Sequence, residues 1–149
     1  MDNEPVIRKA TVEDAEVVAK MFDAYRMFYQ QPADPQEAIK FITERLQLNE
    51  SAILIAFIDD NAVGFAQLYP IFSSVSMQRT WLLNDLYIDP FARGKGVASA
   101  LLDAAKDFGR STNSKWLMLQ TGITNAAAQA LYEKNGWHKE TDIFYSIDL

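Results

Sequence analysis

The sequence predicts an α/β protein in which a mixed β-sheet carries helices on both faces. Two nearly continuous apolar runs, residues 51–58 and 62–71, have the composition of neighbouring buried strands. Four other segments carry apolar residues at the 3.6-residue spacing of amphipathic helices. One of these helices separates two strand-like segments, residues 81–88 and 115–121, and a whole helix between two strands indicates a parallel pair.

The first third of the chain predicts a strand and then two helices. The strand covers residues 5–10, and Thr11 has the chemistry of a helix N-cap. The helix after it is expected to end near Gln30. Asp34 followed by Pro35 then starts a second helix, because proline is favoured at the first helical position.

The middle of the chain predicts a hairpin, a loop, a strand and a helix. Turn residues 59–61 join the two apolar runs as a hairpin, and residues 72–78 form a loop. The strand at 81–88 ends before Pro90, which has no N–H to donate and a fixed φ. Apolar residues at helical spacing then predict a helix over residues 97–108.

The last third predicts a strand, a helix and two short strands. Residues 115–121 form the strand, Asn125 caps the helix, and residues 135–136 stop it. Two final strands are expected within residues 137–149. The complete order is β-α-α-β-β-β-α-β-α-β-β, in a single domain that spans residues 1–149.

Composition narrows the function classes. A net charge of −6 argues against binding to nucleic acid or to an acidic membrane, since both are polyanions. The chain has no cysteine, which excludes a thiolate nucleophile, and its one histidine, His138, forms no zinc site and is expected to be structural or at the surface. The first residues lack the build of a signal peptide and no apolar run is long enough to cross a bilayer, so a cytoplasmic protein without a metal is expected.

A basic, glycine-rich turn lies between the strand at 81–88 and the helix after it. It consists of Arg93, Gly94, Lys95 and Gly96, where a helix leaves its first N–H groups unpaired. Glycines let a ligand approach the backbone, and the helix dipole with two cations favours an anion. The turn therefore predicts a phosphate-binding site.

This turn lacks two common phosphate-binding signatures. It has no Gly-Lys-Ser/Thr ending, which a Mg²⁺-dependent P-loop requires, and no three-glycine dinucleotide fingerprint. Two alternatives remain at this point. The turn either caps a surface helix without binding anything, or it belongs to a nucleotide-binding domain that holds ATP.

Two distant segments together resemble the GNAT superfamily of N-acetyltransferases. The first comprises residues 86–90 (LYIDP) and 93–98 (RGKGVA), and it resembles the family's Arg/Gln-x-x-Gly-x-Gly/Ala acetyl-CoA loop. The second comprises Thr121 and residues 125–137 (NAAAQALYEKNGW). The order of elements is also that of the family, so the resemblance implies a GNAT fold with a sheet splayed between strands 4 and 5. Within the family, the chain is most similar to the small histone and polyamine acetyltransferases, although Ala98 replaces a glycine that many members have.

The resemblance implies acetyl-CoA as cosubstrate. Its pantetheine arm would pair with the open strand edge and with Asn125, its diphosphate would lie on the amides that open the third helix, and Lys134 would lie near its adenosine end. The residues implied to hold acetyl-CoA are Leu86, Tyr87, Ile88, Arg93, Gly94, Lys95, Gly96, Val97, Ala98, Ser99, Asn125, Tyr132 and Lys134.

Two residues are candidates for proton transfer. Tyr132 matches the family tyrosine that protonates the CoA sulfur, and a phenol is protonated at neutral pH; the alternative is that it only packs its helix on the sheet. Asp85 is the candidate base for a charged primary amine. It could instead bind the acceptor or accept from backbone amides at a bulge, where Asn84 is also a candidate bulge residue or substrate contact. Asp89 is expected to form the turn before Pro90.

These observations predict an acetyl-CoA-dependent N-acetyltransferase in which a primary amine attacks directly. The acceptor would be a small amine or polyamine, or a protein lysine or N-terminus. Tyr29 and Tyr69, each near the end of an element, are the candidates for its pocket. The alternatives are a CoA-binding sensor or interaction module of the same fold without turnover, and the ATP-binding domain. A homodimer is possible, with the final strand pairing across subunits.

Overall fold

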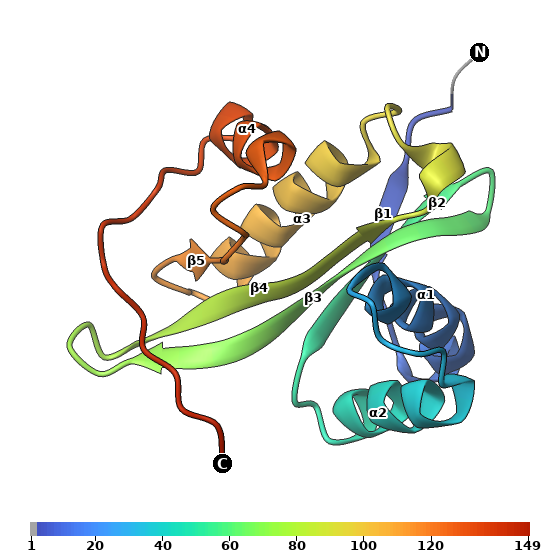
Figure 1. Ribbon diagram of the computed structural model, residues 1–149, viewed down its shortest axis with the longest axis horizontal. Helices are drawn as coiled ribbons and strands as arrows, with labels where there is room; N and C mark the ends of the chain where they lie inside the picture. Colours follow the sequence, from blue (N-terminus) through green and yellow to red (C-terminus); the bar gives the residue numbers. More distant parts are fainter. Residues whose placement is uncertain (1–2) are drawn as a thin grey trace.

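A computed structural model describes residues 3–149 and contains a five-stranded sheet with helices on both faces (Figure 1). The spatial order of the strands is β1-β2-β3-β4-β5. Their bounds are β1 Val6–Lys9, β2 Ala52–Ile58, β3 Asn61–Ser73, β4 Gln78–Ile88 and β5 Leu117–Met118. The first four strands pair antiparallel, while β5 runs parallel to β4. The predicted mixed sheet is therefore confirmed.

The four α-helices lie in two pairs on opposite sides of the sheet (Figure 1). Helices α1 (Ala15–Phe28) and α2 (Pro35–Gln47) cover one face. Helices α3 (Val97–Ser111) and α4 (Ala126–Lys134) lie on the other face. Two short 3₁₀ helices, η1 (Val12–Asp14) and η2 (Pro90–Ala92), precede α1 and α3.

Each face of the sheet has its own apolar core, because side chains of a strand alternate between the two faces. On the α3 side, Leu68 and Leu83 of the sheet pack with Leu101 of α3. On the α1 and α2 side, Phe65 packs with Val18 and other helix residues. The two layers of helices therefore hold β3 and β4 between them, and the candidate site lies along the outer edge of β4.

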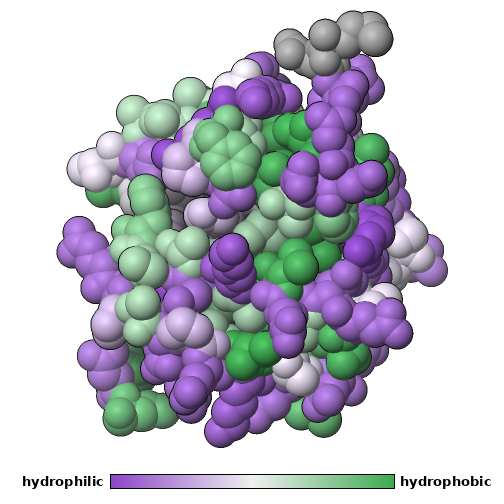
Figure 2. Space-filling model, turned by 90° about the vertical axis from the view of Figure 1, so that its right-hand side faces the viewer, coloured by the Kyte–Doolittle hydropathy of each residue, from purple (hydrophilic) through white to green (hydrophobic). Residues whose placement is uncertain are grey.

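The surface carries polar and charged side chains with smaller apolar groups between them. Figure 2 shows this mixture on the face at the right-hand side of Figure 1, with hydrophilic residues over most of it. Within residues 3–149, none of the helices is both long and apolar enough to span a membrane.

Several predicted boundaries are confirmed and others shift. Asp34 caps α2, since its carboxylate accepts from the Glu37 amide at 3.2 Å. The first helix starts later than Thr11, because a 3₁₀ turn occupies residues 12–14. The predicted loop at 72–78 is shorter than expected: residues 74–77 form the turn, and β3 and β4 continue on either side as a long hairpin, paired from Gly64↔Ile88 to Ser73↔Gln78.

The predicted final two strands are also wrong. Residues 137–149 form no strand in the described chain. The alternating apolar residues of this segment gave a strand pattern, but a strand needs a neighbouring edge for its backbone groups. Figure 1 shows the segment running past the sheet to the C-terminus, and residues 138–149 are exposed.

Candidate functional site

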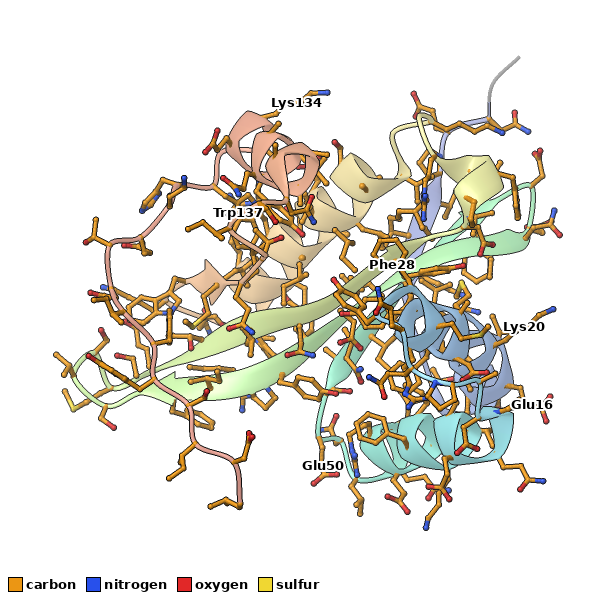
Figure 3. The ribbon with its side chains drawn as sticks, viewed as in Figure 1. Glu16, Lys20, Phe28, Glu50, Lys134 and Trp137 are labelled. Atoms are coloured by element: carbon orange, nitrogen blue, oxygen red, sulfur yellow. The ribbon has the colours of Figure 1, made fainter. Side chains whose placement is uncertain are left out.

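Strands β4 and β5 part soon after they meet. Their registered pairs are Trp81↔Leu117 and Leu82↔Met118, and just before them the Lys115 amide donates to the Arg79 carbonyl. From Leu83 onward, β4 has no strand beside it on that side within residues 3–149. A crevice of about 260 Å³ opens along this free edge. One wall consists of Tyr25 and Phe28 of α1 and Tyr29, which follows that helix. The other walls come from β4, from Arg93, from the segment after β5 and from α4. In Figure 3, Phe28 lies where the end of α1 approaches β4.

Backbone groups of β4 point into this crevice. The Asp89 amide donates to the Val63 carbonyl at 2.8 Å, which makes Gly64↔Ile88 a non-hydrogen-bonded pair of the antiparallel ladder. The N–H and C=O groups of Ile88 therefore point away from β3, toward the open edge. The same alternation directs the backbone of Leu86 to the crevice and that of Tyr87 to β3.

A β-bulge interrupts β4 at Asn84. Gln67 is opposite Asp85 and Leu68 is opposite Leu83, so Asn84 is the extra residue. Its carbonyl accepts from the Tyr25 hydroxyl at 3.3 Å, which ties the bulge to α1. Asn84 is thus the bulge residue that the sequence offers as one alternative, and it also lines the crevice.

The predicted phosphate-binding turn forms an open group of amides before α3. Gly94 and Gly96 have φ of 76° and 79°, which L-residues with a side chain rarely adopt. A Cβ built on either glycine would meet no atom within 4 Å, so there is free space above the turn. Arg93 and Lys95 are exposed beside it, and the first N–H groups of α3 have no helical partner. This donor set fits a diphosphate.

Helix α4 brings Asn125 and Tyr132 to the crevice. The Asn125 side-chain oxygen caps the helix by accepting from the Ala128 amide at 3.1 Å, which leaves its NH₂ group as a donor. The Tyr132 ring packs near Trp137, with centroids 6.2 Å apart, below α4 in Figure 3. Burial, with a smaller contribution from Tyr29, raises the pKa of Tyr132, so its phenol stays protonated at neutral pH.

Asp85 is buried, with an exposed fraction of 2%, on the face covered by α1 and α2. Its Oδ2 accepts from Gln67 Nε2 at 2.5 Å and its Oδ1 from Asn84 Nδ2 at 2.7 Å. Burial raises the pKa of Asp85, and the two amide donors oppose that rise. The bonds that hold this carboxylate come from side-chain amides, where sequence reasoning had considered backbone amides of the bulge.

Of the other residues predicted from the sequence, some line the crevice and others lie elsewhere on the fold. Lys134 is exposed in the last turn of α4 and projects away from the sheet in Figure 3. Ser99 accepts at its hydroxyl from Asn135 Nδ2 at 3.2 Å, a bond that joins α3 to α4. Tyr29 lines the crevice. Tyr69 lies on the Asp85 side, where burial and the Asp85 charge raise its pKa to about 12.

Three further residues have structural roles. Asp89 accepts from the Tyr87 hydroxyl at 2.8 Å and precedes η2, as its turn role predicted. His138 is at the surface beside Glu140, 3.1 Å from Nε2 to Oε1. Val97 is buried in the core, although its amide opens α3. Among residues 3–149, the structure has no group of three or more His, Cys, Asp or Glu side chains placed to hold a metal ion.

Two buried residues linked to Asp85 are not among the candidates that the sequence predicts. Gln67 and Ser51 form a buried hydrogen bond, 2.8 Å from Oγ to Oε1, and Gln67 reaches Asp85. The available signal was a single polar residue inside the apolar run 63–68, which lies in a strand buried on both faces. Such a residue requires a polar partner.

Comparison with known proteins gives one consistent result. The model of the Acetyltransferase (GNAT) family matches residues 18–137. An uncharacterized N-acetyltransferase of Bacillus subtilis, YhfO, is 48% identical over 144 residues, which are 96% of this chain and 97% of that protein. A probable acetyltransferase of Haemophilus influenzae is 38% identical over 114 residues, 75% and 77% of the two chains. A crystal structure of a probable acetyltransferase has a TM-score of 0.92 at 37% identity and covers 97% of both chains.

Proposed function

The chain belongs to the acetyltransferase (GNAT) family, and from that premise we propose that it moves the acetyl group of acetyl-CoA to a primary amine by direct attack in a ternary complex. The observation that carries the proposal is a crevice that reaches the start of the glycine turn. The crevice along the free edge of β4 has Arg93 in its wall, and Arg93 begins the glycine turn that opens α3. A ligand with an extended arm and a diphosphate matches such a shape.

The donor would bind mainly to backbone groups. The amides of Gly94 to Ala98 would hold the diphosphate, with charge from Arg93 and Lys95 and a hydroxyl from Ser99. The open edge at Leu86 to Ile88 would pair with the pantetheine arm like an added strand. The Asn125 NH₂ group would donate to the same arm, and we propose that Lys134 meets the adenosine end.

Acetyl transfer needs a neutral amine, a polarised thioester carbonyl and a proton for the leaving thiolate. Asp85 is the proposed base for the amine, and Tyr132 is the proposed acid for the sulfur. The Ile88 amide, directed away from β3, would polarise the carbonyl. Because the chain has no cysteine, an acetyl-cysteine intermediate is excluded, and attack in a ternary complex is the direct alternative.

The acceptor end of the proposal rests on aromatic side chains and one carboxylate. The rings of Tyr25 and Tyr29 meet edge to face with centroids 5.0 Å apart, and aromatic faces attract ammonium groups. Asp85 lies close to Tyr25, whose pKa is raised by burial first and by the Asp85 charge second. These features suit a small amine or polyamine, or a protein lysine or N-terminus. Similarity to the histone and polyamine branch and a cytoplasmic location stay predictions.

The test is release of CoA thiol from acetyl-CoA in the presence of a panel of amines. We expect thiol release that depends on at least one amine, together with a mass gain of one acetyl group on that amine. The panel contains polyamines, amino acids, and lysine and N-terminal peptides. Tight binding of acetyl-CoA without turnover on any class would favour the alternative, a CoA-binding sensor or interaction module.

We propose that two copies of the chain associate through the segment 137–149. Its large apolar residues are exposed: Ile143, Phe144, Tyr145, Ile147 and Leu149. Exposed apolar groups of this extent mark an interaction surface, and β5 offers a free edge for strand pairing with a second copy. We expect a dimer mass in light scattering for the full chain and a monomer mass for a variant with Ile143, Tyr145 and Ile147 changed to serine. A full-length monomer at micromolar concentration would contradict the proposal.

A further inference from the structure

Three buried polar side chains form a row across the sheet face under α1 and α2. Ser51 precedes β2, Gln67 lies in β3 and Asp85 in β4, with exposed fractions of 5%, 0% and 2%. The row is hydrogen-bonded from end to end, 2.8 Å from Ser51 Oγ to Gln67 Oε1 and 2.5 Å from Gln67 Nε2 to Asp85 Oδ2. The neighbouring positions on this face, such as Ile53 and Phe65, are apolar. Burying polar groups in such surroundings is costly unless each has a partner.

The chemistry of the three groups fixes the direction of the bonds. An ionised carboxylate only accepts, so Gln67 must turn its NH₂ group to Asp85. Its amide oxygen then faces Ser51, whose hydroxyl donates to it. A donor on the amide oxygen polarises the amide and strengthens the bond that its N–H makes. Asp85 therefore sets which end of Gln67 meets it, and Ser51 supplies the donor for the other end.

We propose that Ser51 and Gln67 are positioning residues that hold the Asp85 carboxylate as the proton acceptor for the incoming amine; this inference rests on the function proposed above. Asn84 holds the other carboxylate oxygen, at 2.7 Å. Each carboxylate oxygen has two acceptor positions and uses one of them here. The group is thus fixed by two amides and keeps positions free for a proton.

The titratable groups around Asp85 permit a pH test. Tyr25 faces it from α1 and Tyr69 from β3, while Arg45 of α2 lies near Tyr69. Burial and the Asp85 charge raise the pKa of both phenols, that of Tyr69 to about 12. Both tyrosines therefore stay neutral between pH 5 and 9, about the range of an activity assay. An acidic limb in that range is assigned to the base Asp85.

The expected effect of breaking the row has a definite sign. Gln67→Leu removes a donor that favours the ionised carboxylate, so the pKa of Asp85 rises. The base acts when deprotonated, so the acidic limb of kcat/KM moves to higher pH, by about one unit. At a given pH on the acidic side of the limb, kcat/KM of Gln67→Leu should be about tenfold lower than that of the wild type. At high pH, where Asp85 is deprotonated in both proteins, the two values should converge. Ser51→Ala should shift the limb the same way but less, and Ser51→Thr, which keeps the hydroxyl, should restore it.

Two measurements and one control variant complete the test. The first measurement is the pH profile of kcat/KM with the best amine; the second is the ¹³C-carboxyl titration of Asp85 in the free protein, assigned with Asp85→Asn. Thr80→Val is the matched control. Thr80 is 1% exposed in β4 and donates to the Ile71 carbonyl at 2.8 Å, away from the row. The Thr80→Val variant loses a hydroxyl hydrogen bond of the same length as the Ser51–Gln67 bond. The acidic limb of its pH profile should stay where the wild type has it.

The inference is overturned if folded Gln67→Leu and Ser51→Ala leave both titrations where the wild type has them, even if thermal stability falls. Should Gln67→Leu fail to fold, Ser51→Ala and Ser51→Thr decide the matter alone. Failure of the proposed function has a different result, a wild-type protein without amine-dependent turnover. The carboxyl titration then still shows whether Gln67 and Ser51 govern the Asp85 charge.

Discussion

Replacing Gly96 with glutamate is expected to abolish acetyl-CoA binding while the protein stays folded. Gly96 is the N-cap of α3, and a side chain built there enters the free space above the amides. A carboxylate in that space would lie against the phosphates of the ligand, and like charges brought together cost several kcal/mol. Affinity should fall by more than about 1000-fold. Isothermal titration with acetyl-CoA measures this, and circular dichroism checks the fold.

The matched control for this variant is Gly96→Ala. Alanine carries the same backbone strain, about 1–2 kcal/mol at positive φ, but no charge. If the turn leaves its binding conformation to relieve this strain, binding must restore that conformation. Gly96→Ala should therefore weaken binding by about tenfold at most. Tight binding by Gly96→Glu would mean that the diphosphate lies elsewhere, and equal losses in both variants would assign the effect to strain.

This turn illustrates what a sequence states most clearly. Its conformation depends on Gly94 and Gly96, on Pro90 a few residues earlier, and on the helix that follows, all local in the chain. The caps at Asp34 and Asn125 are equally local, and both form bonds to amides three residues later. Local chemistry determined these features, so the sequence could predict them.

Features that depend on distant partners were predicted less well. The strand at 115–121 shrinks to Leu117 and Met118, because β4 is its only neighbour and the two strands part. The segment 137–149 has a strand pattern but pairs with none of the strands. The hairpin is longer than predicted because residues 72–73 pair with 78–79. The polar composition of residues 72–78 is typical of a loop, so it does not predict this pairing. Pairing is a tertiary property, and propensity only permits it.

The candidate site divides in the same way. The candidates Asp85 and Tyr132 are predicted from their places in motifs, but the partners of Asp85 are not. Ser51 and Gln67 are 16 residues apart, and each alone resembles an ordinary strand residue. Their relation to Asp85 follows from the register of three strands, Ile53↔Gln67 and Gln67↔Asp85, which no single segment encodes.

Tyr132→Phe is expected to lower kcat by about 10²–10⁴-fold, the usual contribution of a positioned general acid. The substitution keeps the ring that packs near Trp137 and removes only the hydroxyl. That hydroxyl makes no hydrogen bond within residues 3–149, and it lies in the wall of the crevice. Acetyl-CoA affinity should therefore change less than about threefold, since a hydroxyl without a protein partner contributes little to binding. Steady-state kinetics and isothermal titration together separate the two quantities.

The control for this prediction is Tyr145→Phe, which removes a phenol that is 92% exposed and is not among the residues that line the crevice. Its kcat should equal that of the wild type. The pH profile adds a second criterion: because burial raises the pKa of Tyr132, any loss of wild-type turnover from phenol ionisation should begin at higher pH than for a free phenol. Unchanged turnover in Tyr132→Phe would exclude this residue from proton transfer and leave it a packing role. A fall in acetyl-CoA affinity as large as the fall in kcat/KM would instead make it a binding residue.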